Sequence, residues 1–256
     1  MKETKVIIEK NSEVADSIYE ATLLLDEPAQ DIWAGKFLNV SVGDGSHILK
    51  RPFGISDYDA KGEKVKFCYQ VRGEGTEKLS KLKCGTELMA TLPLGNGFLL
   101  DKNWKKIAIL AGGMGVCPFG GMGKSYPDKH FVAYLGFRNK KAECLTKRIS
   151  RFADLRIVYD DEPLENAKNA VELFLNEYES ENFDAILCCG PKPMFRALKN
   201  AIENRKIDIP CFVSLEERMG CGVGACLVCV CKQAKAEGNV RVCKDGPVFP
   251  ISEVEL

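Results

Sequence analysis

The chain carries near its C-terminal end the stretch Glu217-Arg218-Met219-Gly220-Cys221-Gly222-Val223-Gly224-Ala225-Cys226-Leu227-Val228-Cys229, which Cys243 completes. The four cysteines follow the spacing C-x4-C-x2-C-x13-C, which is the plant-type spacing of 2Fe-2S ligands. The glycines of the loop let the backbone approach a cluster closely and point N–H groups at its sulfurs. The spacing therefore predicts an electron carrier whose 2Fe-2S cluster is held by Cys221, Cys226, Cys229 and Cys243.

Other uses of these thiols are a zinc site, a disulfide pair, and buried cysteines that act as small apolar residues. Zinc sites usually combine two C-x2-4-C pairs that lie far apart, whereas here three thiols share one glycine-rich loop. Soft thiolates favour an iron-sulfur cluster, zinc or Cu(I) over hard cations. We rank the iron-sulfur cluster first and keep the other uses as alternatives. The fifth thiol of the region, Cys231, is expected to be a non-ligand.

Composition excludes several classes of function. The 256 residues include 36 Lys and Arg and 36 Asp and Glu, so no net field attracts nucleic acid or an anionic membrane. The N-terminal residues mix charged and apolar side chains, unlike a signal peptide, and no apolar run reaches the length of a transmembrane span. Five of the twelve cysteines fall between 221 and 243, which indicates metal binding in a reducing compartment rather than disulfides. We expect a cytoplasmic protein with no nucleic-acid or membrane partner.

The pattern of apolar residues predicts three parts. Residues 1–100 hold short β-type runs at 6–8, 18–25, 36–42 and 64–71 and one short helix at 76–82, which favours an antiparallel barrel or sandwich. Beyond residue 104, strands before the glycine turn at 112–115 and at 130–137, 155–159 and 183–190 alternate with helical periods at 167–179 and 193–203. That alternation predicts a doubly wound parallel sheet. The expected parts are a β-barrel over 1–100, an α/β domain over 101–212 and a cluster module over 213–256.

Three segments of the barrel region attract attention. Arg51-Pro52-Phe53-Gly54 presents a guanidinium, which is a good bidentate partner for a pyrophosphate. The segment from Tyr69 to Thr76 is a strand followed by a glycine turn and a helix start, where N–H groups and the Thr76 hydroxyl can hold a phosphate. Pro93-Leu94-Gly95-Asn96-Gly97-Phe98 reads as a tight turn. Taken singly, each of the three is more often a plain turn than a binding site.

In this order the segments resemble the ferredoxin-NADP reductase superfamily, whose motifs are Arg-Pro-x-x on one strand, Gly-x-Gly-Thr after the next and Pro-Leu-Gly-x-Gly before a βα region. The resemblance implies that the barrel binds FAD, with the helix start at its pyrophosphate. Gly54 stands where the family usually has Ser or Thr, so the Gly54 backbone or Ser56 is expected to replace that hydroxyl beside the flavin. The FAD contacts implied are Arg51, Pro52, Phe53, Gly54, Tyr69, Gln70, Val71, Gly75 and Thr76.

The α/β part contains two motifs for a pyridine nucleotide. Gly112-Gly113-Met114-Gly115 follows a strand, as in a βα nucleotide-binding unit, although such a turn is about as often a packing feature. Cys189-Gly190-Pro191-Lys192-Pro193-Met194 resembles the superfamily's Cys-Gly-Pro-x-x-Met motif, which lies beside the nicotinamide. Because ligands of open α/β sheets bind outside the carboxyl ends of the strands, both motifs should face one crevice. The contacts expected for NAD, an exchangeable substrate, are Gly112, Gly113, Gly115, Cys189, Gly190, Pro191 and Met194.

The order of the three modules resembles the family of electron-transfer subunits of type B dihydroorotate dehydrogenase. Further resemblance lies in residues 135–141 and in Cys226-Leu227-Val228-Cys229-Val230-Cys231-Lys232, and it covers nearly the whole chain. The resemblance assigns the cluster to the same four cysteines. It also implies an FMN-containing catalytic partner subunit in a heterotetramer with two of each chain. Electrons would pass from that FMN through the 2Fe-2S cluster and FAD to NAD+, in pyrimidine biosynthesis.

No catalytic acid or base constellation is evident, because His47 and His130 stand alone. Hydride transfer requires only that the nicotinamide stack correctly on the flavin, so we predict no catalytic residue in this chain. Two other functions remain open. One is the small flavin and iron-sulfur subunit of an NADH-dependent ferredoxin:NADP oxidoreductase or of a sulfhydrogenase. The other is a non-enzymatic, metal-binding redox sensor.

Overall fold

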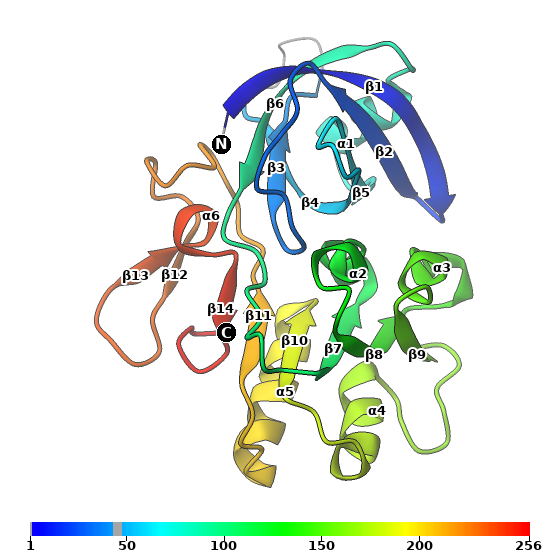
Figure 1. The fold of residues 1–256 in the computed structure, drawn as a ribbon, viewed down its shortest axis with the longest axis vertical. Helices are drawn as coiled ribbons and strands as arrows, with labels where there is room; N and C mark the ends of the chain where they lie inside the picture. Colours follow the sequence, from blue (N-terminus) through cyan, green and yellow to red (C-terminus); the bar gives the residue numbers. More distant parts are fainter. Residues whose placement is uncertain (1, 43–47) are drawn as a thin grey trace.

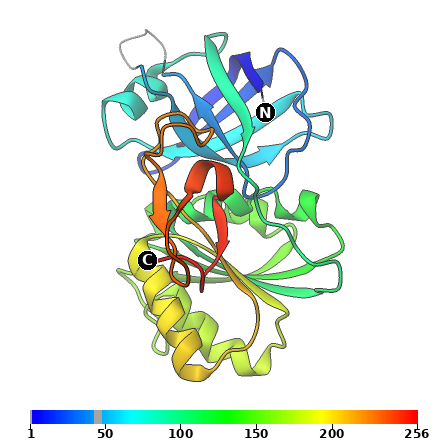
Figure 2. The ribbon, with the colours of Figure 1, turned by 90° about the vertical axis from the view of Figure 1, so that its left-hand side faces the viewer.

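The structure is a computed structural model that describes residues 2–42 and 48–256. Figure 1 shows a barrel above an α/β unit, with the C-terminal segment in orange and red along one side. In Figure 2 that segment lies across the junction between the barrel and the sheet. Within the described ranges, no helix has both the length and the apolar character needed to cross a membrane.

The barrel is a closed antiparallel sheet with the strand order β1-β2-β5-β4-β3-β6. Its core is formed by alternate residues of these strands, as in β6, where Leu88, Ala90 and Leu92 are buried and Glu87 and Met89 are exposed. The helix α1 (Glu74–Lys81) connects β5 to β6. The strands are β1 (Lys2–Ala15), β2 (Ile18–Leu25), β3 (Phe37–Val40), β4 (Arg51–Tyr58), β5 (Lys64–Gln70) and β6 (Glu87–Leu94).

The α/β unit is a six-stranded sheet with the order β14-β11-β10-β7-β8-β9. Neighbouring strands are parallel except at the edge, where β14 runs antiparallel to β11. The strands are β7 (Lys106–Gly112), β8 (His130–Phe137), β9 (Ala153–Tyr159), β10 (Ala185–Cys189), β11 (Cys211–Ser214) and β14 (Val248–Pro250).

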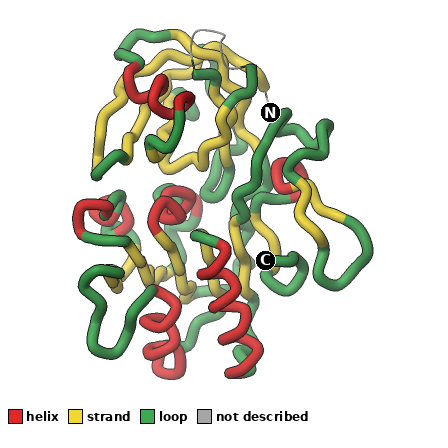
Figure 3. The backbone as a smooth tube through the Cα atoms, turned by 180° about the vertical axis from the view of Figure 1, so that it is seen from behind, coloured by secondary structure: helices red, strands yellow, loops and turns green. Residues whose placement is uncertain are grey.

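Helices cover both faces of this sheet. The helices are α2 (Met122–Ser125), α3 (Thr146–Ile149), α4 (Ala170–Glu177) and α5 (Lys192–Arg205), with 3-10 turns η1 (Gly113–Phe119), η2 (Lys140–Ala142) and η3 (Tyr178–Ser180). Figure 3 shows α4 and α5 below the sheet and α2 and α3 between the sheet and the barrel. Alternate strand residues face the two layers: Leu110 belongs to the apolar cluster with Phe174 of α4, and Ile109 to the cluster with Phe119 of η1. The predicted barrel and doubly wound sheet are confirmed.

The cysteine-rich segment contains a two-stranded ribbon, β12 (Val230–Lys232) with β13 (Asn239–Arg241), and the short helix α6 (Val242–Asp245). This segment shares the sheet of the α/β unit. Strand β11 begins before and ends after residue 212, the predicted boundary, and β14 pairs with β11 at the edge of the sheet. The division into modules at 1–100, 101–212 and 213–256 therefore stays a prediction, and the sheet itself continues past its second boundary.

An ion pair joins the barrel to the α/β unit. Arg148 of α3 donates through Nη2 to both carboxylate oxygens of Glu20 on β2, at 3.0 and 2.5 Å. Only 19% of the Arg148 side chain and 13% of the Glu20 side chain are exposed, so water screens the pair weakly. Backbone contacts support the junction: a Cβ at Gly120 would lie 2.2 Å from the Ser56 carbonyl oxygen, so only glycine fits there.

We expect Glu20→Gln to lower the free energy of unfolding by about 2 kcal/mol, because the charged hydrogen bonds of a half-buried guanidinium are lost. Urea unfolding followed by circular dichroism measures the change. The control is Glu27→Gln, which breaks the exposed Lys2–Glu27 pair and should leave stability unchanged. Equal effects of the two variants would show that the junction does not depend on the Arg148 pair.

Candidate functional site

A pocket with a volume of ≈ 320 Å³ lies where the barrel, the α/β unit and the segment after β11 meet. The barrel contributes strands β4 and β5, and the α/β unit contributes η1 and the end of β10. The third wall follows β11. The lining residues are Gly35, Phe37, Pro52, Phe53, Gly54, Cys68, Tyr69, Gln70, Arg72, Thr76, Met114, Cys117, Pro118, Cys189, Ser214, Leu215, Glu216, Glu217, Met219 and Pro247.

Most of the residues predicted to contact FAD gather at this pocket. Arg51, Val71 and Gly75 are the members of the predicted set that do not line it. Arg51 nevertheless lies against the start of α1, because a Cβ at Gly75 would be 2.9 Å from its Nε atom. Gly75 therefore allows the guanidinium to lie beside the N-terminus of a helix, where an anion is favoured. The predicted residues that line the pocket are Pro52, Phe53, Gly54, Tyr69, Gln70 and Thr76.

The Thr76 hydroxyl is engaged at the start of α1. Its Oγ1 accepts from the backbone N–H groups of Arg72 (2.9 Å) and Gly73 (3.2 Å) and donates to the Gly73 carbonyl (3.0 Å). The hydroxyl thus satisfies backbone groups of the turn. Its role is to shape the loop that carries Arg72 into the pocket.

The expectation that Ser56 supplies a hydroxyl beside the flavin is wrong. Ser56 is fully buried and does not line the pocket, and its Oγ accepts from Arg148 Nη1 at 3.5 Å. Gly54 itself does line the pocket, and a Cβ there would lie 3.3 Å from Cγ of Pro118 in η1. The small residue lets η1 approach β4, so only backbone groups remain at this position for a ligand.

The two nucleotide motifs lie side by side at the carboxyl ends of the paired strands β7 and β10. That they bind NAD in one crevice stays a prediction. A Cβ at Gly112 would be 2.9 Å from Met194 Sδ and from Pro191 Cδ. A Cβ at Gly115 would be 2.1 Å from the Cys189 carbonyl oxygen. These glycines therefore allow the turn after β7 to pack on the turn after β10. Of the predicted NAD set only Cys189 lines the pocket; Gly112, Gly113, Gly115, Gly190, Pro191 and Met194 do not.

The Cys189 thiol is almost inaccessible, with 1% of the residue exposed, and burial raises its pKa strongly. A hydrogen bond with Ser214 acts in the opposite direction but is the weaker influence. Cys189 therefore stays a neutral thiol, which suits an apolar contact at the end of a strand.

The four predicted ligands form two pairs. The Cys221 N–H group donates to Cys226 Sγ and the Cys243 N–H group to Cys229 Sγ, both at 3.4 Å. Cys229 and Cys243 are buried, whereas Cys226 is exposed and Cys221 half-buried. Within residues 2–42 and 48–256, no three Cys, His, Asp or Glu side chains gather as one metal ion would require. Two thiol pairs fit the two irons of a 2Fe-2S cluster better than a zinc ion, which needs three or four ligands at one point.

The loop supplies N–H donors to one sulfur in particular. Cys221 Sγ accepts from the backbone N–H groups of Val223, Ala225 and Cys226 at 3.3 to 3.4 Å. Burial opposes ionisation, but these hydrogen bonds prevail and lower the pKa of Cys221 to about 6. The loop is therefore arranged to hold a thiolate before any metal binds.

The Cys231 thiol is engaged with the backbone near the C-terminus. Its Sγ donates to the carbonyl of Glu255 at 3.4 Å, and Cys231 pairs with Val240 in the β12–β13 ribbon. That Cys231 is not a ligand stays a prediction.

The third wall of the pocket was not predicted from the sequence. It consists of Ser214, Leu215, Glu216, Glu217 and Met219, directly after β11. Strand β11 has only four residues, which is too few for the sequence to show an alternation of buried and exposed residues. Its position in the sheet depends on its pairing with β10. The run of β-type residues Cys211-Phe212-Val213 before the cysteine loop was the available signal.

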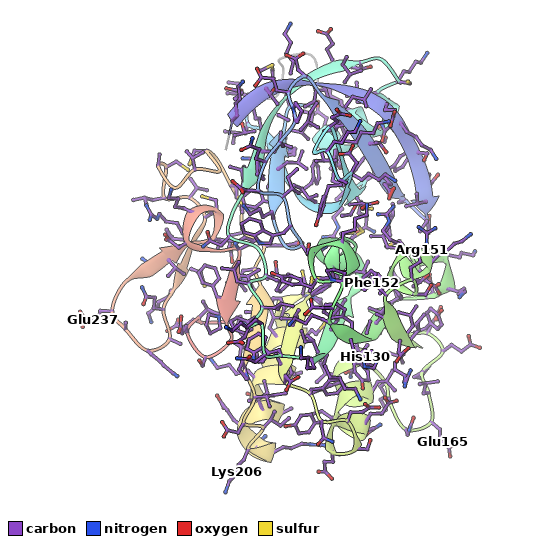
Figure 4. All side chains as sticks on the ribbon, viewed as in Figure 1. His130, Arg151, Phe152, Glu165, Lys206 and Glu237 are labelled. Carbon is purple, nitrogen blue, oxygen red and sulfur yellow. The ribbon has the colours of Figure 1, made fainter. Side chains whose placement is uncertain are left out.

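His130 does not line the pocket. His130 is the first residue of β8, at the end of the sheet opposite the pocket (Figure 4), and its Nε2 lies 2.9 Å from Asp154 Oδ2. His47 lies outside the described residues.

The chain is similar to known proteins in sequence and in fold. Residues 216–255 match the family model described as the iron-sulfur cluster binding domain of dihydroorotate dehydrogenase B. The structure of an NADH-dependent reduced ferredoxin-NADP oxidoreductase is similar in fold, with a TM-score of 0.85 at 20% identity over 98% of this chain and 89% of that one. Phthalate dioxygenase reductase, at a TM-score of 0.67 and 16% identity, covers 99% of this chain and 98% of its own.

Two relatives match over the full length. The electron transfer subunit of dihydroorotate dehydrogenase B (NAD(+)) from Clostridium acetobutylicum is 37% identical, with 100% of this chain and 99% of the relative covered. The corresponding subunit from Bacillus pumilus is 35% identical over the same shares. With this identity along its entire length, the chain belongs to the family of electron transfer subunits of dihydroorotate dehydrogenase B (NAD(+)).

Proposed function

We propose that this chain carries electrons from the FMN of a catalytic partner subunit, through a 2Fe-2S cluster on its cysteine loop and FAD in its pocket, to NAD+. The observation that carries the proposal is that the pocket and the cysteine loop both pack against one apolar cluster. Phe37 lines the pocket and belongs to the same apolar cluster as Cys229 and Cys243. Met219 lines the pocket and also packs against that cluster. The pocket and the buried thiol pair thus border the same apolar cluster.

When bound, FAD supplies a group that exchanges two electrons as a hydride and one electron at a time, whereas a 2Fe-2S cluster exchanges single electrons. The residues of this chain bind and orient. In this proposal Arg51 and the start of α1 bind the pyrophosphate, and Pro52, Phe53, Gly54, Tyr69 and Gln70 bind the flavin; the approach of Arg51 to Gly75 and the lining of the pocket support these roles. Cys189 and Met114, which line the opposite wall, are proposed to guide the nicotinamide.

The partner is proposed to cover the cysteine loop. Leu227 and Val228 are 60% and 55% exposed, and they lie between the exposed Cys226 and the buried Cys229. Large apolar side chains at an electron-transfer site suit a protein interface better than open solvent. The partner is an FMN-containing dihydroorotate dehydrogenase catalytic subunit, the assembly a heterotetramer with two of each chain, and the location cytoplasmic.

The ferredoxin-linked alternative shares the fold, as the TM-score of 0.85 indicates, but the identity of 20% falls well below the 37% of the dihydroorotate relative. A redox sensor without enzymatic function would not need the pocket. The two oxidoreductase functions differ in what reduces the cluster.

The experiment mixes the purified chain with the catalytic subunit of a dihydroorotate dehydrogenase B and supplies dihydroorotate and NAD+. We expect orotate and NADH in equal amounts and a complex whose mass corresponds to two copies of each chain. Reduction of ferredoxin by NADH, with no orotate formed, would favour the ferredoxin-linked function instead. A chain purified anaerobically without flavin absorbance would contradict both.

We expect Cys226→Ser to abolish the paramagnetic signal of the reduced cluster while FAD stays bound, because one of the four thiolates is lost and the pocket is untouched. Electron paramagnetic resonance and the flavin absorbance measure the two outcomes. Cys231→Ser is the matched control and should keep the signal, since its thiol points to Glu255. A wild-type spectrum from Cys226→Ser would remove Cys226 from the ligand set.

We expect Arg51→Ala to weaken FAD binding by about 1.5 to 3 kcal/mol, or roughly 10- to 100-fold, because a charge-assisted contact to the pyrophosphate is lost. Titration of the flavin-free chain with FAD measures the dissociation constant. Arg205→Ala, at the far end of α5, removes one positive charge and should not change it. Unchanged affinity in Arg51→Ala would contradict the placement of the pyrophosphate beside α1.

A further inference from the structure

The proposed electron route leaves one proton to be explained. Two electrons that arrive singly through a metal cluster bring no protons with them. The hydride that joins NAD+ consists of two electrons and one proton. The pocket must therefore take in one proton for every two electrons, and release one when the reaction runs in the opposite direction.

Most ionisable groups on the pocket wall are unsuited to this transfer. The pKa of Tyr69 is raised by burial, and its hydroxyl donates to Asn11 Oδ1 at 2.8 Å. Hydrogen bonds with Cys144 and Cys68, together with burial, raise the pKa of Cys117 well above its ordinary value, and burial does the same for Cys189. These three groups hold their protons at neutral pH.

The remaining lining groups are occupied or cannot titrate. The Cys68 thiol lies 3.8 Å from Ser56 Oγ and is itself buried. The Arg72 guanidinium donates to Gln70 and stays charged in proteins. The Glu217 carboxylate forms an ion pair with Lys192 Nζ at 2.6 Å. Glu216 is the other carboxylic acid of the pocket wall, and it forms no ion pair within the described residues.

Glu216 is placed between the two sides of the pocket. Its carboxyl interacts with Cys189 at the end of β10 and with Arg72 of the barrel. Glu216 is an exposed residue that lines the open pocket, and its carboxyl lies close enough to protein atoms to lose part of its hydration. Burial raises the pKa of Glu216 and the Arg72 charge opposes that rise, so the pKa lies above that of an ordinary Glu. A ligand that fills the pocket would displace the water at its open side and raise the pKa further.

We propose that Glu216 is the proton-exchanging residue of this pocket, accepting a proton from water and passing it to the flavin as the electrons arrive. The proposal rests on FAD occupying the pocket. In each cycle the carboxyl loses its proton to the ring nitrogen that forms the hydride and regains one from solvent. Two electrons and one proton enter, and one hydride leaves with NAD+. Backbone hydrogen bonding fixes the segment, since the Leu215 N–H group donates to the Pro247 carbonyl at 2.9 Å.

The test measures the midpoint potential of bound FAD against pH in the wild-type chain and in Glu216→Gln. In the wild type, reduction adds negative charge to the flavin, which should favour protonation of Glu216. The plot of midpoint potential against pH should therefore be steeper over a window of pH. Glu216→Gln should lose that window. In the complete complex its rate of NADH formation should fall by about 10²-fold or more, the contribution of a positioned acid, while the KM for NAD+ stays unchanged.

Glu217→Gln is the charge control, because it removes one negative charge from the same segment. It should displace the potential at every pH and keep the steeper window. Glu216→Asp retains a carboxyl and should keep the window at a different pH with a partly restored rate, and it replaces Glu216→Gln if that variant does not retain flavin. A Glu216→Gln plot that keeps the window, or a Glu216→Asp plot that lacks it, overturns the proposal. A wild-type chain that binds no flavin would instead refute the proposed function.

Discussion

The cysteine loop is pressed so closely against the barrel that only glycine fits at the contact. A Cβ at Gly222 would lie 2.2 Å from Asn39 Nδ2 of β3, and Gly222 has a φ of +72°. Both the spacing and the backbone conformation therefore require glycine. Since Asn39 pairs with Pro52, a pocket residue, this contact places the loop one strand away from the pocket. Electron transfer requires the cysteine loop and the pocket to lie close together, and this contact holds the loop near the pocket.

The pocket is a product of the whole fold. One wall belongs to the barrel, another to the ends of β7 and β10, and the third to the segment that leads from the sheet into the cysteine loop. The ion pair between Arg148 and Glu20 and the approach of Gly120 to Ser56 hold the first two walls together. Any motion that separated the barrel from the sheet would pull the walls of the pocket apart. A fixed junction therefore keeps the two walls in one geometry, which hydride transfer between stacked rings requires.

Sequence reasoning succeeded where the chemistry was local. The spacing of four cysteines and the β-type runs at 18–25 and 130–137 each depend on neighbours in the chain, and the structure has strands at Ile18–Leu25 and His130–Phe137. It failed where tertiary contacts decide. Ser56 follows the Arg-Pro motif closely, yet its hydroxyl turns to Arg148 of another unit. Glu216 belongs to no motif recognised in the sequence. Its position in the pocket depends on the pairing of β11 with β10 and on the packing of the barrel against the α/β unit.

The two thiol pairs have different surroundings, which gives the route through the loop a direction. Cys229 and Cys243 lie inside the apolar cluster that also contains Phe37 of the pocket wall. Cys221 and Cys226 face outward, and Cys221 Sγ receives three backbone N–H groups that stabilise negative charge. Charge on Cys221 is stabilised by these backbone dipoles and by solvent, while Cys229 and Cys243 are shielded from solvent and Cys229 Sγ accepts from the Cys243 N–H group. The proposed electron route therefore runs from the buried thiol pair to the exposed side of the loop, which also carries the exposed side chains of Leu227 and Val228.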